Sequence, residues 1–83
     1  MDLGLIKVFV CIYESRHISK AADKLNLSQP SVTYNLNRLR RQLNDELFTR
    51  SRGGVEPTKV AHELYPIFHQ AIFNIESAIA QAQ

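Results

Sequence analysis

Residues 21–33, which read AADKLNLSQPSVT, decide the fold of this 83-residue chain. Asn26 tolerates the left-handed conformation that closes a helix. Ser28 is a good N-cap, and Pro30 falls in the first turn of the next helix, where its missing N–H costs little. Leu27, between the two helices, is expected to point inward. The stretch therefore predicts a short helix, a tight turn and a second helix.

The helix after the turn has two contrasting faces. Its apolar residues recur within an arc of about 60°, at Val32, Leu36, Leu39 and Leu43. The opposite face and the exposed first turn carry Gln29, Pro30, Ser31, Thr33, Tyr34, Asn37, Arg38 and Arg41. Such a face suits hydrogen bonding rather than packing.

The segments before this unit predict one further helix. Residues 3–15 are apolar nearly all round, so this helix must be covered on more than one side. Cys11 within it is interpreted as a small core residue rather than a reactive thiol. Ser19 is expected to cap the short helix that precedes the turn.

The segments after it predict a hairpin and a long helix. Residues 47–50 and 55–57, joined by the turn 51–54, predict a short hairpin, which after a helix-turn-helix is a wing. Thr58 is expected to cap a last helix of about 25 residues. Pro66 within this helix should kink it or split it in two.

These elements define a mainly α, winged helix-turn-helix fold with three helices and a hairpin wing, followed by a long helix. We divide the chain into a winged unit, residues 1–57, and a linker helix, residues 58–83. The last helix stops at Gln83 without a cap, so we expect the chain to be a fragment of a longer protein.

The charge of the chain is concentrated in one part. Residues 16–52 carry eight Lys and Arg against three Asp and Glu, a net charge of +5. The rest carries two against five, a net charge of −3. A polyanionic partner is thereby indicated, although a solvated charged face is the commoner explanation for such a run.

The sequence of the helix-turn-helix and its flanks resembles that of a known family. The chain is similar to the N-terminal part of LysR-type transcriptional regulators, matched at Phe9, Ala21-Ala22, Leu25, Ser28-Gln29-Pro30-Ser31-Val32, Leu36, Arg38-Leu39, Leu47-Phe48, Arg50, Gly54-Val55 and Pro57-Thr58. The resemblance implies sequence-specific binding to double-stranded DNA, with the third helix in the major groove and the wing at the minor groove. It also implies a following effector-binding domain and a cytoplasmic, nucleoid-associated bacterial protein.

Side-chain chemistry assigns roles within this frame. Gln29 can give two hydrogen bonds to adenine, and Pro30, Thr33 and Tyr34 can meet thymine methyls and base edges. The expected phosphate contacts are Lys20, Ser28, Ser31, Arg38 and Arg50, and Arg52 is the expected minor-groove residue. The alternative for any one of these side chains is that it makes no DNA contact and is simply solvated at the surface. Arg40 and Arg41 could instead pair with Asp45 and Glu46.

Two positions depart from the family pattern. Thr33-Tyr34 stands where the family most often has Ser-Arg, so Tyr34 lacks a charged base or phosphate contact. Arg52 lies one residue earlier in the wing than the basic residue of many members.

The last helix has two compatible interpretations. Residues at 4-3-4-3-4 spacing from Leu64 form a seam like that of a coiled coil, and the same stripe can pack on the first helix of its own chain. The expected dimerisation residues are Leu64, Phe68, Ala71, Ile72, Ile75 and Ile79. The resemblance implies a homodimer through this helix, binding an inverted repeat, and a higher oligomer for the full-length protein.

Other functions have little support. His62 and His69 are two helical turns apart rather than the one turn of a zinc pair, and no catalytic set or phosphate loop can be defended. We therefore predict no enzyme activity, no metal and no cofactor. The longest apolar run is far too short to span a membrane. The remaining alternative is an all-helical dimerisation or adaptor module that binds only protein.

Overall fold

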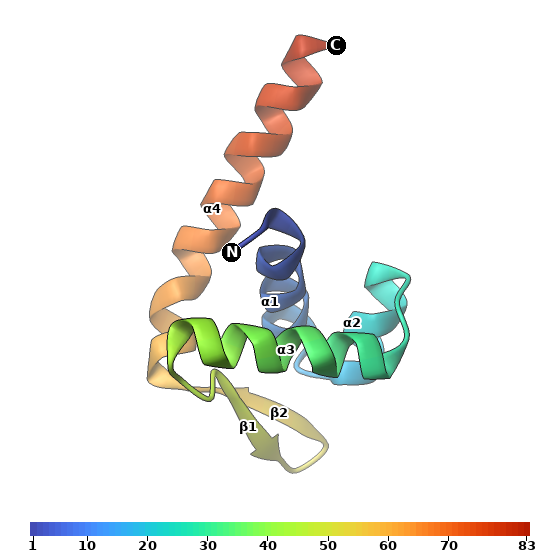
Figure 1. The fold of residues 1–83 in the computed structure, drawn as a ribbon, viewed down its shortest axis with the longest axis vertical. Helices are drawn as coiled ribbons and strands as arrows, with labels where there is room; N and C mark the ends of the chain where they lie inside the picture. The colour runs from blue at the N-terminus through green and yellow to red at the C-terminus, as the bar shows by residue number, and fades with distance from the viewer.

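The computed structural model describes residues 1–83 and confirms the predicted fold. Four helices and an antiparallel hairpin follow in the order α1 (Leu3–Ser15), α2 (Ile18–Leu25), α3 (Gln29–Leu43), β1 (Phe48–Ser51), β2 (Gly54–Pro57) and α4 (Lys59–Ala82). The hairpin and the free end of α4 point in opposite directions (Figure 1). No helix is both long and apolar enough to cross a membrane.

Most helix ends lie where local signals place them. Asn26 and Asn44 end α2 and α3 in the left-handed region, with φ of 59° and 52°. The Ser28 hydroxyl accepts a hydrogen bond from the N–H of Ser31 at 3.2 Å. Thr58 caps α4 in the same way. These ends match because each one depends on residues within a single turn.

The start of α2 differs from the expectation at Ser19. His17 occupies the N-cap position, and it makes no side-chain capping bond. Its carbonyl already accepts the N–H of Ala21 at 3.0 Å. The helix starts early because Arg16, with φ of 59°, reverses the chain immediately after α1. Ser19 therefore lies inside the first turn of α2.

The expectation for Leu27 is wrong, and of the two expectations for Pro66, a kink or a split, the split is wrong. Leu27 does not point inward: its side chain is 41% exposed, while its N–H closes the turn on the carbonyl of Ala22 at 2.9 Å. Pro66 does not split α4, which continues through it as one helix. A proline removes a single N–H from the helical ladder, and packing of the first half of α4 on α1 outweighs that loss.

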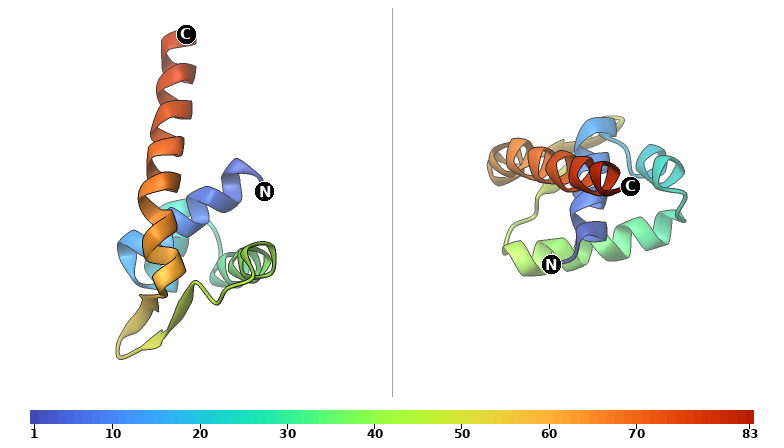
Figure 2. Two further views of the ribbon diagram at one scale, coloured as in Figure 1. Left: turned by 90° about the vertical axis from the view of Figure 1, so that its left-hand side faces the viewer. Right: turned by 90° about the horizontal axis from the view of Figure 1, so that it is seen from above.

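The core is built around α1. This helix contacts α2, α3 and α4, and it separates α3 from α4 (Figures 1 and 2). The ring of Phe9 is fully buried, 5.4 Å from that of Phe48 and 5.2 Å from that of Phe68 between centroids. One aromatic cluster thus joins α1, the wing and α4. The fully buried Ala61 brings the first turn of α4 into the same core, so the interpretation of residue 57 as a domain boundary stays a prediction.

The remaining predicted core residues pack as follows. The stripe of α3 is confirmed, with Val32, Leu36 and Leu39 buried and Leu43 half-buried. Cys11 is a free cysteine that packs against the core. Burial raises the pKa of its thiol, which disfavours the reactive thiolate.

Candidate nucleic-acid interface

The start of α3 forms an ordered, exposed cap. The hydroxyl of Ser28 donates to that of Ser31 at 2.9 Å while it also accepts the backbone N–H of Ser31. Pro30 occupies the first turn, and the backbone of this turn carries the positive end of the helix dipole. The two predicted phosphate-binding serines therefore lie together at a helix end that favours anions.

The four predicted base-reading residues share one solvent-exposed face of α3, which we call the recognition face. Gln29, Pro30, Thr33 and Tyr34 are all exposed, and they line a shallow surface depression together with Asn37. Tyr34 is 63% exposed, which leaves a large aromatic ring without a partner in the chain. The structure places these residues side by side; their base contacts stay a prediction.

A groove runs between α3 and the wing, and the start of α2 borders it. Gln29 and Thr33 line it from α3, Arg50 from β1, and residues 17–19 from the start of α2. Arg50 is exposed there. A polyanionic backbone that followed the recognition face would therefore meet Arg50 across the groove.

The other predicted phosphate contacts lie outside this groove. Lys20 is exposed on α2, one residue beyond the part that borders the groove. Arg38 is half-buried and lines a separate depression with Asn35 and Lys7, between α1 and α3. The structure thus distributes the predicted phosphate contacts around the recognition face rather than in one patch.

The wing is a hairpin with a tight tip. Ser51 pairs with Gly54, so Arg52 and Gly53 form the turn, and Gly53 has φ of 81°. Arg52 is exposed at this tip. Gly54 faces the backbone carbonyl of Arg16, where a Cβ would collide with the oxygen. The wing can therefore approach the turn after α1 only because residue 54 is glycine.

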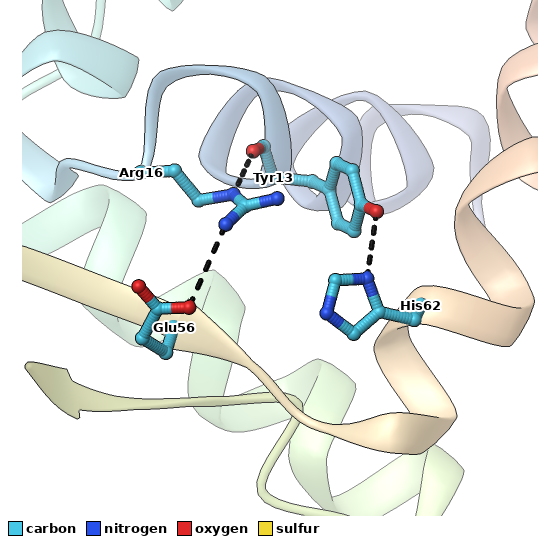
Figure 3. A network of polar contacts seen from close by, with 4 residues as sticks. All are labelled: Tyr13, Arg16, Glu56 and His62. Atoms are coloured by element: carbon cyan, nitrogen blue, oxygen red, sulfur yellow. Dashed lines mark hydrogen bonds and ion pairs between the residues drawn. The ribbon is translucent and has the colours of Figure 1, made fainter.

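The turn after α1 holds the wing through Arg16 (Figure 3). The carbonyl of Arg16 accepts the N–H of Val55 at 3.0 Å. Its guanidinium lies 3.7 Å from the carboxylate of Glu56, donates to the carbonyl of Tyr13 at 2.7 Å, and covers the Tyr13 ring at 4.7 Å. Sequence reasoning missed this anchor because its partners are about forty residues apart and share no local period.

An aromatic and polar cluster joins α1 to α4. The rings of Tyr13 and Tyr65 stack with their centroids 4.0 Å apart. Figure 3 shows the hydroxyl of Tyr13 facing Nδ1 of His62, 2.8 Å away. Tyr65 donates to the carboxylate of Glu14 at 2.5 Å, which raises the pKa of Tyr65 to about 12. His69 lies 3.9 Å from the same carboxylate. The two histidines are thus engaged in the packing of α4 on α1, and no group of three or more ligating side chains could hold a metal.

The predicted ion pairs of Arg40 and Arg41 with Asp45 and Glu46 do not form. Arg40 instead donates to the backbone carbonyls of Glu46 and Phe48, each at 2.7 Å. The carboxylate of Asp45 accepts from the N–H of Leu47 and the hydroxyl of Thr58. Backbone carbonyls of the segment that leads into the wing compete for the guanidinium here, and they accept two of its N–H groups in a geometry that sequence spacing does not reveal.

The predicted dimerisation residues divide into two sets. Leu64, Phe68 and Ile72 are half-buried and pack against the core of their own chain. Ile75 and Ile79, in the second half of α4, are 42% and 52% exposed. The C-terminal turns of α4 project beyond the other helices (Figure 1). Ala71 is half-buried between the two sets. Only the second set is free in this chain to meet another one.

Comparison with known proteins identifies the class. Residues 3–62 match the family described as bacterial regulatory helix-turn-helix protein, lysR family. The chain is 40% identical over 78 residues to the uncharacterized HTH-type transcriptional regulator YbdO of Escherichia coli, covering 94% of this chain and 26% of that protein.

Two solved structures have the same fold. OxyR of Corynebacterium glutamicum in its oxidized form superposes with a TM-score of 0.93 at 33% identity, over 99% of this chain and 26% of that one. The DNA-binding domain of BenM, solved in complex with the catB site 1 DNA, superposes with a TM-score of 0.92 at 27% identity, over 99% and 92%.

The fold is therefore that of a LysR-type helix-turn-helix DNA-binding domain. The chain belongs to the lysR family of bacterial regulatory proteins. This family consists of transcriptional regulators, which are not enzymes. The chain spans about a quarter of the length of the curated relatives it matches.

Proposed function

We propose that this chain recognises a specific sequence of double-stranded DNA by placing the first two turns of α3 in the major groove. The observation that carries the proposal is the exposed face formed by Gln29, Pro30, Thr33 and Tyr34. A helix that exposes polar and aromatic side chains at its capped N-terminus fits the width of the major groove. The BenM domain, a structural neighbour of this chain, was solved on DNA.

The roles within this interface follow from side-chain chemistry. Gln29 gives two hydrogen bonds to one adenine, whereas Thr33 and Tyr34 offer hydroxyl and apolar surface to neighbouring bases. Ser28, Ser31, Lys20, Arg38 and Arg50 bind phosphates and fix the register of the helix. Arg52, at the exposed tip of the wing, reaches the adjacent minor groove.

We further propose that two copies pair through α4. One helix-turn-helix unit contacts too few base pairs for specificity, and a two-fold pair reads an inverted repeat. The uncovered Ile75 and Ile79 in the second half of α4 support this arrangement. A higher oligomer of the full-length protein and a cytoplasmic, nucleoid-associated location belong to the same proposal.

The test is selection of bound duplexes from random DNA, followed by affinity measurements at several salt concentrations. We expect an inverted repeat to be enriched, and log K to fall with log salt at a slope near −0.9 per neutralised phosphate. No duplex affinity at low salt would contradict the proposal and favour the adaptor module that binds only protein. Enrichment of no common sequence would limit the function to non-specific binding.

A further inference from the structure

Asn37 extends the recognition face by one helical turn beyond Thr33, although it is absent from the set of predicted base-reading residues. It is exposed and lines the same depression as Gln29, Pro30, Thr33 and Tyr34. At about 100° per residue it falls about 40° from Thr33 and about 60° from Tyr34 around the helix axis. It is one helical turn beyond Thr33, about 6 Å further along α3.

The amide of Asn37 is held in one orientation. Its Oδ1 accepts a hydrogen bond from Nη1 of Arg40 at 3.0 Å. A guanidinium has only donors, so the oxygen of the amide must face Arg40 and the NH₂ group must face away. Arg40 takes one of the two lone pairs of this oxygen, and Asn37 presents two N–H donors on the side away from Arg40.

Arg40 is itself immobilised by the segment that leads into the wing. Its Nε and Nη2 donate to the backbone carbonyls of Glu46 and Phe48 at 2.7 Å each. The planar fork of the guanidinium makes these two bonds and the bond to Asn37 together, which a flexible lysine could not do. The orientation of the Asn37 amide is thus set by the backbone at the start of β1.

We infer that Asn37 is a donor-only specificity residue, directed at a base that presents an acceptor in the major groove, and that Arg40 is its positioning residue. Guanine O6 and N7 and thymine O4 are such acceptors. A free asparagine amide reads adenine through one donor and one acceptor. Because the oxygen of Asn37 is turned toward Arg40 and has one lone pair taken by it, the outward-facing donors favour a base edge that only accepts.

The inference rests on the proposed DNA binding, so the experiment begins with the selected inverted repeat bound by the unchanged chain. Each base pair of the half-site is then varied in turn, and the affinities of three variants are compared. Asn37→Ala removes the amide. Asn37→Asp keeps an acceptor for Arg40 and replaces the outward donors with a second acceptor. Asn35→Asp, on the other side of α3, is the control for the added negative charge.

We expect Asn37→Ala to flatten the preference at one base pair of each half-site by about tenfold and to leave the other positions unchanged. Asn37→Asp should move the preference at that pair to a base with a donor, cytosine N4 or adenine N6. Asn35→Asp should lower affinity for all duplexes alike without changing any preference. An equal loss on every sequence with Asn37→Ala, or no loss at all, would overturn the base contact.

The positioning role has its own measurement. Arg40→Lys keeps the charge, so the salt slope should stay the same while the preference relaxes at the base pair that responds to Asn37→Ala. The double variant, with both Arg40→Lys and Asn37→Ala, should lose no more base preference at that pair than Asn37→Ala alone. An unchanged preference pattern in a folded Arg40→Lys chain would overturn the role of Arg40. Failure of the unchanged chain to bind any duplex would instead overturn the proposed function.

Discussion

The N-terminal half of α3 and the C-terminal half of α4 both present side chains to solvent, but they differ in what lies behind them. The back of α3 is buried in its own chain through Val32, Leu36 and Leu39. Residues 73–82 of α4 are all exposed, including Phe73 and Ile79. The exposed face of α3 is polar, and that of α4 is largely apolar.

The difference separates two kinds of surface. The recognition face lies on a helix whose back is buried in its own chain, so it keeps its shape without a partner. A surface that recognises a DNA sequence needs this rigidity. An apolar helix end without cover gains free energy only when another surface covers it. We therefore expect substitutions in α3 to change which DNA is bound, and substitutions in the end of α4 to change how many chains assemble.

The largest effect is expected from Ile79→Asp. If Ile79 is buried between two chains, an unpaired carboxylate there costs several kcal/mol, and the dimer dissociation constant should rise at least about a hundredfold. Sedimentation at micromolar concentration measures this. Ser77→Asp, which adds the same charge on another face of α4, should leave the dimer intact. A dimer that survives Ile79→Asp would place the contact elsewhere, with Phe73 as the next candidate.

The first half of α4 should behave in the opposite way. Phe68 packs edge-on against Phe9 in the core of its own chain, so Phe68→Ala should lower the free energy of unfolding by about 3 kcal/mol. Urea unfolding of the monomeric Ile79→Asp chain, with and without Phe68→Ala, measures this change in the free energy of unfolding without a contribution from dimerisation. A loss below about 1 kcal/mol in that background would mean that α4 is not part of the folded unit.

Gln29→Ala tests the recognition face of α3 itself. We expect a loss of about 1 to 3 kcal/mol at the base pair that Gln29 contacts, with little change on random DNA. Arg38→Ala is the contrasting variant: it should weaken binding to all sequences alike and reduce the salt slope by about one. Competition between the selected duplex and a random one measures both. Equal losses on the two duplexes for Gln29→Ala would remove its base-reading role.

The smallest effect concerns the cluster between α1 and α4. The hydrogen bond from Tyr65 to Glu14 raises the pKa of Tyr65 from 10.0 to about 12. Because the folded pKa is the higher one, the stabilisation is complete below pH 10.0 and is lost as the pH rises towards about 12. Tyr65→Phe should therefore be less stable at neutral pH and should lose less stability between pH 10.0 and about 12.

Thermal unfolding of both chains across this range measures the difference, which solvent screening keeps small. Coincident curves for the original chain and Tyr65→Phe would show that the hydrogen bond does not contribute to stability, and a constant offset would contradict its predicted loss at high pH.

The sequence by itself determined the elements whose signals are local. Helix ends are marked by hydrogen bonds within one turn, at Asn26, Ser28, Asn44 and Thr58. The helical period of α3 separates its buried face from its recognition face. The exposed set on α3 could be predicted for the same reason, since residues on one helix face are neighbours wherever the helix lies.

Only the tertiary structure decided what depends on partners distant in the sequence. It placed Arg16 against Glu56, directed Arg40 to backbone carbonyls instead of acidic side chains, and left Leu27 at the surface. It also divided the apolar stripe of α4 into a half used by its own core and a half left free. A periodic stripe records that a face will be buried, but what covers it depends on how the helices are arranged in space.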